Sequence, residues 1–242
     1  MNVALPAGEP AVRTQTDRVH RRLRADIIAG RLAPGTRLAM EQLKTAYGVG
    51  LSPLREALSR LSSQGLVEQL SQRGFRVAGV SRADLRDIWD MRLRLESEAL
   101  ERSIKEGDSD WRNACRAAHD SLADFYADRP VTPDNHEIWE ERHRAFHMQL
   151  LAACPSRWLL RFCAQLYDQF DRYRRLAGLD RGFYRGMVDE HRDLLEAALE
   201  GSQEDAVLIL RRHIRRTTET VEARLSAPDT LAATEDVRAS TR

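Results

Sequence analysis

Apolar residues return every three or four positions along most of this chain, which is the spacing of one face of an α-helix. In the first third of the chain, the pattern predicts three helices, at about 16–29, at 40–47 and from Ser52 to just before Gly65. Two short alternating runs, 66–70 and 75–78, then flank a polar turn and predict a β-hairpin. Helix, helix, short turn, helix and hairpin, in this order, are the elements of a winged helix-turn-helix.

Local signals mark the ends of the three helices. Gly30 and Gly48 follow the first two, where a glycine can end a helix in the left-handed conformation. Ser52 is expected to cap the third helix through its hydroxyl, with Pro53 at the first helical position. The second and third helices are therefore joined by only a short turn.

After Ser81 the chain contains only long amphipathic helical patterns, which predict an all-α helical bundle. The six expected helices lie near 83–105, 110–128, 135–153, 157–176, 184–200 and 203–225. The stretches 1–13 and 226–242 lack apolar periodicity, and we expect them to be disordered tails. The fold class predicted from the pattern is mostly α, with a winged helix-turn-helix at 14–80 and a helical bundle at 81–225.

The net charge of +1 conceals an uneven distribution. Residues 11–82 carry 13 Lys and Arg against 5 Asp and Glu, a balance of +8, whereas residues 83–242 carry 25 against 31, a balance of −6; Glu9 supplies the remaining −1. A basic module of this size is what attraction to the phosphate backbone of DNA requires. Charge alone fits a solvated basic face equally well, so it supports DNA binding only together with the helix pattern.

Helix-turn-helix proteins present the start of their third helix to the edges of the bases. Arg55 lies in that first turn and can bind a guanine through two hydrogen bonds. Ser52 and the neighbouring backbone amides suit a phosphate oxygen at the helix N-terminus. Arg60 is a candidate phosphate contact, and Arg73, at the tip of the hairpin, could follow the backbone or enter the minor groove. Any one of these arginines could also be a solvated surface charge.

Four of the seven histidines fall on the apolar stripes of three different helices. His143 and His147 are one helical turn apart, while His191 and His213 each continue a stripe of aliphatic residues. Imidazoles on the inward faces of bundle helices can together bind a divalent metal ion, with zinc favoured and nickel possible. One such histidine is more often an ordinary core residue, but burying four unpaired imidazoles would be costly.

The residues of the first domain resemble the DNA-binding domain of the GntR family of bacterial transcription regulators. The motifs that carry the resemblance are Gly30-x-Leu32-x-Pro34-Gly35-x-x-Leu38, Tyr47-Gly48-Val49, Ser52-Pro53-Leu54-Arg55-Glu56-Ala57-Leu58, Leu61 and Gly65-Leu66-Val67. The resemblance implies a DNA contact by Arg55. Members of the family commonly carry Ser-Arg after the Gly-Val pair, and that arginine reads the operator. Here Gly50-Leu51 stands in its place, so the operator is expected to differ.

The second domain resembles the FCD type of effector-binding and dimerisation domain in the FadR branch of that family. The matching segments are Asp87-Ile88-x-x-Met91-Arg92-x-x-Leu95-Glu96, Phe146-His147, Glu190-His191-Arg192-x-Leu194-Leu195-x-Ala197, Ala206 and Arg212-His213. The resemblance implies a central metal held by one aspartate and three histidines. The three histidines match His147, His191 and His213, and the aspartate position is His143. Segments 51–61 and 142–147 are similar to a narrower branch of repressors of glutarate, 2-hydroxyglutarate and γ-aminobutyrate catabolism.

A metal with open coordination positions accepts a carboxylate oxygen, and an arginine in the same cavity can bind that group through two hydrogen bonds. Arg92 matches the arginine of the family pattern. Arg172, Tyr173 and Arg174 could supply a second anchor for a dicarboxylate effector; a surface helix face is the alternative for all three, and it is the favoured expectation for Arg174. A repressor released from its operator by such a dicarboxylate is therefore the function that we expect.

Other classes of protein fit the sequence less well. A metal-dependent enzyme is the main alternative, but Glu140 and Glu141 are expected to turn away from the face of His143 and His147, which leaves no positioned base. An architectural DNA-binding protein would need neither the histidines nor Arg92. No apolar run approaches the ~20 residues of a membrane span, and Met1 to Arg13 lacks the core of a signal peptide. We expect a cytoplasmic homodimer that binds double-stranded operator DNA.

Overall fold

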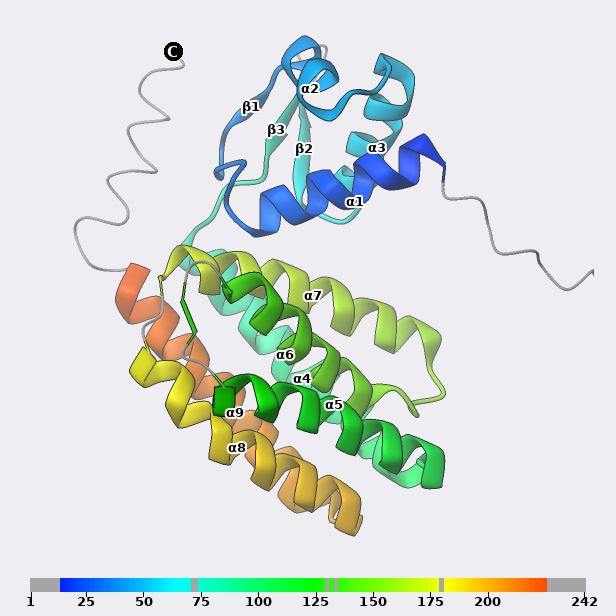
Figure 1. The fold of residues 1–242 in the computed structure, drawn as a ribbon, viewed down its shortest axis with the longest axis vertical. Helices are drawn as coiled ribbons and strands as arrows, with labels where there is room; N and C mark the ends of the chain where they lie inside the picture. The colour runs from blue at the N-terminus through cyan, green and yellow to red at the C-terminus, as the bar shows by residue number, and fades with distance from the viewer. Residues whose placement is uncertain (1–13, 71–73, 129–130, 133–134, 179–180, 226–242) are drawn as a thin grey trace, which may run out of the picture. The chain divides into compact units, whose positions relative to one another are not determined.

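The computed structural model describes residues 14–70, 74–128, 131–132, 135–178 and 181–225. The chain divides into two compact units, with the boundary between Gly79 and Val80. The first unit contains α1 (Gln15–Ile28), β1 (Arg37–Leu38), α2 (Met40–Tyr47), α3 (Leu51–Ser63), β2 (Val67–Leu70) and β3 (Gly74–Val77). The mostly helical fold and the winged helix-turn-helix are confirmed (Figure 1).

The three strands form an antiparallel sheet in the order β1-β3-β2. The hairpin of β2 and β3 was expected, and Val67 faces Val77 across it. The pattern of the sequence does not predict β1. This strand is only two residues long, too short to show an alternating pattern, and it forms because Leu38 pairs with Phe75 of β3.

Helix α3 begins one residue earlier than its sequence indicates, and the expected cap at Ser52 is wrong. Gly50 occupies the capping position in an extended conformation, and no side chain caps the helix. Pro53 is therefore the third helical residue, where its missing N–H costs no helical hydrogen bond because the first-turn amides have no partner within the helix. The turn before α3 is tight because Gly48 adopts a left-handed φ of 64°.

The core of the first unit lies between α1, α3 and the sheet. Helix α3 contributes a stripe with no exposed area at Leu54, Ala57, Leu58 and Leu61. The inner face of α1, including Leu23, packs against this stripe. Burying the stripe fixes the rotation of α3 about its axis, and it leaves the opposite face of the helix exposed to solvent.

The second unit is a bundle of long helices: α4 (Arg82–Glu106), α5 (Ser109–Asp128), α6 (His136–Leu151), α7 (Arg157–Leu176), α8 (Arg181–Glu200) and α9 (Gln203–Leu225). Helix α4 packs against α6, α7 and α9, α5 packs against α6 and α8, and α8 packs against α9 (Figure 1). Ser81 caps α4 by accepting a hydrogen bond from the amide of Asp84 at 3.1 Å. Among the described residues, no helix combines the length and the apolar character needed to cross a membrane.

Candidate functional site

The exposed face of α3 has two sides that differ in their partners. On one side Glu56 accepts a hydrogen bond from Thr16 of α1, and Arg60 donates to Asp17 at 2.9 Å and also binds Glu56. On the other side Leu51 and Arg55 lie one turn apart, both exposed. The structure shows no ion pair of Arg55 with another described residue, so its guanidinium is available to a ligand.

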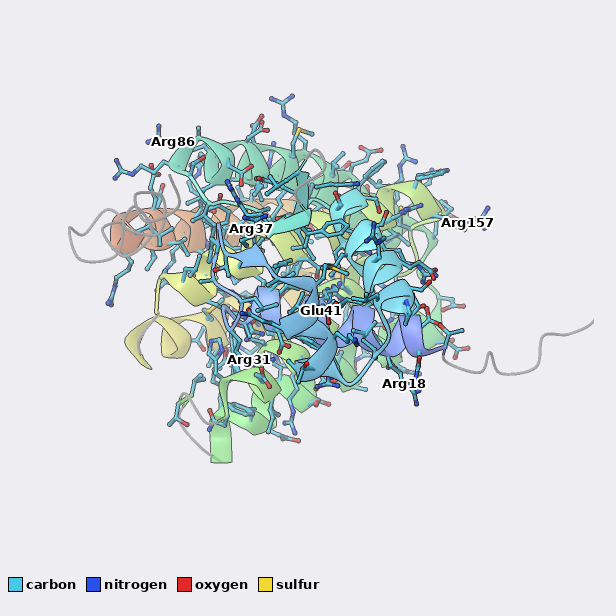
Figure 2. All side chains as sticks on the ribbon, turned by 90° about the horizontal axis from the view of Figure 1, so that it is seen from above. Arg18, Arg31, Arg37, Glu41, Arg86 and Arg157 are labelled. Carbon is cyan, nitrogen blue, oxygen red and sulfur yellow. The ribbon has the colours of Figure 1, made fainter. Side chains whose placement is uncertain are left out.

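The other DNA-binding candidates are also placed on the first unit. Ser52 is exposed in the first turn of α3, and Arg73 lies outside the described residues. Figure 2 shows cationic side chains at the surface of this unit, among them the exposed Arg18, Arg31 and Arg37. The sequence-predicted basic character is therefore carried by side chains that reach solvent.

The four candidate histidines converge inside the bundle. His143 and His147 come from α6, His191 from α8 and His213 from α9, and each is at most 4% exposed. One potential ligand atom from each histidine lies within 4.8 Å of those of the other three. The Nε2 atoms of His143 and His147 are 3.2 Å apart. Burial is the main cause that lowers the pKa of all four imidazoles, so that they are held in the neutral form that can bind a metal.

The donor set of this cluster fits a metal ion. Both ring nitrogens of His191 are buried, and neither has a hydrogen-bond partner among the described residues. Glu190 accepts a hydrogen bond from Nδ1 of His213 at 2.9 Å, an arrangement that directs the other ring nitrogen of His213 into the cluster. Burial alone would raise the pKa of Glu190, but hydrogen bonds from His213 and Arg216 lower this pKa to about 2.

Two buried arginines reach the cluster, each with a carboxylate partner. Arg92 of α4 donates to Glu96 from Nε at 2.5 Å and from Nη2 at 3.1 Å. Arg174 of α7 donates to Nδ1 of His143 at 3.0 Å and to Asp171 at 2.8 Å, and it also binds Glu140. The expectation that Arg174 faces solvent is wrong, since it is 2% exposed.

The structure also corrects the expected direction of Glu140. Its carboxylate is 3% exposed and points toward Arg174 and His136 rather than away from the cluster. Burial raises the pKa of Glu140 well above its usual range, which the positive charge of Arg174 opposes. Glu140 is therefore a buried carboxyl partner of Arg174, to which the guanidinium donates a hydrogen bond.

Arg172 and Tyr173 are placed away from this cavity. The Arg172 guanidinium donates to Oε1 of Gln169 at 2.9 Å. The hydroxyl of Tyr173 accepts a hydrogen bond from the amide of Ser81 at 3.0 Å and donates to Asp84 at 2.5 Å. Tyr173 thus joins the last turns of α7 to the first turn of α4. The structure brings Arg92 and the histidines together, and it brings Arg174 to them in place of Arg172 and Tyr173.

A small enclosed cavity lies beside the histidines. Its free volume is about 10 Å³, and it is lined by Arg92, His143, His147, Tyr167, Phe170, Arg174, His213, Ile214 and Thr217. This volume holds about one water molecule. An organic ligand that binds here must therefore displace side chains or helices.

Two family models match the chain, one for bacterial regulatory proteins of the gntR family over residues 15–77 and one for the FCD domain over residues 87–216. The chain belongs to the GntR family. An uncharacterized HTH-type transcriptional regulator, BphR of Paraburkholderia xenovorans (strain LB400), is 39% identical over 220 residues, which cover 90% of this chain and 89% of BphR. The HTH-type transcriptional repressor GlaR of Escherichia coli (strain K12) is 33% identical over 199 residues, which cover 81% of this chain and 90% of GlaR.

Solved structures support the same fold. E. coli McbR/YncC superposes with a TM-score of 0.76 over 88% of this chain and 99% of its own, at 20% sequence identity. The family models and the relatives establish a DNA-binding transcriptional regulator of the GntR family with an FCD domain.

The spacing of residues along α7 in this GntR regulator carries a signal for the burial of Arg174. Tyr167, Phe170 and Arg174 recur at spacings of three and four on α7, and all three line the cavity. An arginine on such a stripe must be buried with its aromatic neighbours, since they share one face of the helix. Neighbouring charges concealed the pattern, because Arg172, Arg174 and Arg175 read together as a solvated face.

Proposed function

We propose that this GntR regulator is a repressor that a small dicarboxylate, such as glutarate or 2-hydroxyglutarate, releases from its operator. The dicarboxylate binds beside a divalent metal ion held by the histidine cluster. The observation that carries this proposal is His191, whose two buried ring nitrogens lack hydrogen-bond partners among the residues that the structure describes, while three further imidazoles lie around it. Polar atoms in this position are costly unless a ligand or ion satisfies them.

The residues that hold the metal are His147, His191 and His213, with His143 as the fourth ligand. Four imidazoles favour zinc or nickel over the hard cations that prefer oxygen ligands. When bound, the metal supplies a Lewis-acidic position for a carboxylate oxygen. Glu190 orients His213, and Tyr167 lies 2.6 Å from Nδ1 of His143, where its oxygen can accept a hydrogen bond from that nitrogen.

The charge of the site supports an anionic effector. Because the four histidine ligands are neutral, they do not compensate either positive charge of a divalent ion buried among them. The nearby cations have their own counterions, because Arg92 pairs with Glu96 and Arg174 pairs with Asp171. An uncompensated buried charge is strongly unfavourable, so the ion requires negative charge from its ligand. A dicarboxylate supplies two negative charges and neutralises the ion.

The cavity lining supports a short aliphatic chain between the two carboxylates. Phe170 and Ile214 provide apolar contacts, whereas Arg92 offers a polar anchor at the cavity. The Nη1 group of Arg92 takes part in neither hydrogen bond to Glu96, so it can donate to the second carboxylate without breaking that pair.

The small volume of the cavity connects effector binding to DNA release. The volume of a five-carbon dicarboxylate is many times larger than the cavity volume of about 10 Å³, so its entry displaces elements that line the site. One of them is α7, which places Arg174 at the cavity and Tyr173 in a hydrogen bond with the amide of Ser81. Ser81 comes two residues after the boundary of the DNA-binding unit. A shift of α7 therefore reaches the start of α4 through Tyr173, and the effector favours the conformation that binds DNA less well.

The regulator acts as a homodimer in this proposal. One recognition helix contacts too few base pairs to select an operator, and two helices on one two-fold axis double that number. The repressor activity named for GlaR supports the direction of regulation. Sedimentation of the protein with and without operator DNA measures the number of chains per complex.

The proposal is tested by metal analysis and ligand binding on the same samples. Protein purified without chelator or histidine tag should contain about one equivalent of zinc or nickel per chain. Glutarate should raise the unfolding temperature of this sample, and glutaramide, which has the same shape without the charges, should not. The His191→Gln variant should lose both the metal and the response to glutarate. Wild-type protein with no metal and no uptake on metal addition would return the histidines to an ordinary core role.

A further inference from the structure

We infer that Leu51 reads the methyl group of a thymine in the operator. Leu51 is the first residue of α3, and 39% of its surface is exposed. It lies one turn before Arg55, on the exposed side of α3 away from Glu56 and Arg60, the two residues that bind side chains of α1. The inference rests on the DNA-binding activity of the family and does not depend on the metal or the effector.

The surroundings of Leu51 give it no other role within the described part of its unit. The apolar residues of α3 that form the core are Leu54, Ala57, Leu58 and Leu61, and Leu51 is not among them. The charged residues on the other exposed side, Glu56 and Arg60, are engaged with α1. The unengaged side consists of Leu51, Arg55 and Ser59, all exposed.

Base chemistry identifies the partner of an apolar side chain on this face. In the major groove, the only apolar group that a base pair presents is the 5-methyl of thymine. Leu51 and Arg55 are four residues apart, which is about 6 Å along the helix axis, or roughly two base pairs of B-DNA. The structure therefore assigns a thymine to Leu51 within about two base pairs of the guanine that Arg55 contacts.

The backbone around Leu51 keeps its side chain close to the DNA. No side chain caps α3, so the first-turn amides of Leu51 and Ser52 remain available to a phosphate oxygen. A phosphate held there fixes the depth of the helix N-terminus in the groove, because the amides and the Leu51 side chain belong to the same turn. Binding then buries the exposed part of Leu51 against the base.

The test removes one methyl group from the DNA. An operator is first selected from random duplexes with the wild-type protein, and each thymine is then replaced by uracil, which lacks only the 5-methyl. We expect one thymine in each half-site at which uracil weakens wild-type binding about fourfold, the factor for one buried methyl-sized group. The Leu51→Ala variant should bind the thymine operator at least fourfold more weakly, and it should show no further loss with uracil.

A reciprocal variant tests the same contact in the other direction. Selection repeated with Leu51→Arg should replace the thymine at that position by a guanine, because arginine binds guanine through two hydrogen bonds. Ser59→Ala, an exposed change farther along the same helix, serves as the control and should retain the uracil effect. Wild-type binding that is indifferent to uracil at every position would overturn the inference. A uracil effect that persists in Leu51→Ala would also overturn it, since another residue would then contact the methyl.

Discussion

Arg174 of α7 donates from Nη1 to Nδ1 of His143 on α6 at 3.0 Å, and this contact controls which nitrogen of that histidine carries a proton. A guanidinium can only donate, so the contact leaves the proton of a neutral His143 on Nε2, the atom that faces His147. The Tyr167 hydroxyl, 2.6 Å from the same Nδ1, can instead accept a hydrogen bond from it, which leaves Nε2 free for a metal. Arg174 therefore favours the tautomer of His143 with the proton on Nε2, whereas Tyr167, which can donate or accept, can support the other tautomer.

The first prediction is that His143 contributes less to metal affinity than the other three histidines. Metal binding through its Nε2 requires the loss of the hydrogen bond from Arg174, which offsets part of the energy of the new bond. His143→Ala should lower zinc affinity by a smaller factor than His191→Ala, with both measured by competition with a chromophoric chelator. The Tyr167→Phe variant, which removes the acceptor for Nδ1, should fall between wild type and His143→Ala. Equal losses in the two alanine variants would show that His143 is a full ligand.

The second prediction concerns the buried charges around Arg174. Arg174→Met leaves the carboxylates of Glu140 and Asp171 buried without this cation, and we expect it to reduce the free energy of unfolding by about 3–5 kcal/mol. The double variant Arg174→Met/Glu140→Gln should recover part of this loss, since it removes a buried carboxyl group that has lost its partner. Denaturant unfolding measures both values. A double variant less stable than Arg174→Met alone would contradict the assignment of Glu140 as its partner.

The third prediction is that metal-free protein loses stability as the pH falls. Burial lowers the pKa of the four histidines below the usual value of about 6.5. Below this pH the unfolded chain therefore binds protons that the folded bundle does not bind. The contribution of the histidines to the free energy of unfolding is complete above about pH 6.5 and is lost as the pH decreases below it.

The size of this effect can be measured in excess chelator between pH 7.5 and 5.5. Each histidine contributes at most about 1.4 kcal/mol per pH unit below pH 6.5. Replacing one member of the cluster, as in His213→Gln, should reduce the slope of the free energy of unfolding against pH by the equivalent of about one proton taken up on unfolding. A free energy of unfolding that does not change over this range would show that the folded protein takes up protons as readily as the unfolded chain, so that burial does not lower the pKa of these imidazoles.

The fourth prediction is that two arginines of α3, Arg55 and Arg60, contribute differently to operator affinity because, among the described residues, only Arg60 has partners within its own unit. Arg55→Ala should weaken operator binding by about 1–3 kcal/mol and relax the base preference at one position of each half-site. Arg60→Ala is the matched control on the same helix, and it should cost less, because Arg60 already binds Asp17 and Glu56 within the unit. Fluorescence anisotropy with a labelled operator measures both. Loss of affinity confined to Arg60→Ala would move the DNA-reading face to the other side of α3.

The sequence predicted the helices because each buries a periodic apolar stripe, as α3 does with Leu54, Leu58 and Leu61. It also predicted that His143, His147, His191 and His213 would meet, since each lies on such a stripe. Both outcomes depend on local periodicity, which a single helix already contains.

The partners of the charged side chains could not be predicted in the same way. Arg174 is buried because Glu140 of another helix and Asp171 of its own compensate its charge, and no local pattern shows that combination. The hydroxyl of Tyr173 meets Ser81 and Asp84, which are about ninety positions away in sequence. The start of α3 was misplaced for a different reason, since a glycine and a serine can both cap a helix and only the backbone conformation decides between them.

Operator, metal and dicarboxylate take part in one coupled equilibrium, and one titration tests it. Glutarate and 2-hydroxyglutarate are added to the complex of the zinc-loaded protein with labelled operator, and anisotropy reports the release of DNA. Release should occur with zinc-loaded wild type, and it should be abolished in Tyr173→Phe, which retains ligand binding but loses the link to Ser81. Operator DNA should in turn weaken binding of the effective dicarboxylate by the same factor by which that ligand weakens DNA binding. Dicarboxylates that bind the zinc-loaded protein with equal affinity in the presence and absence of operator would contradict the central claim.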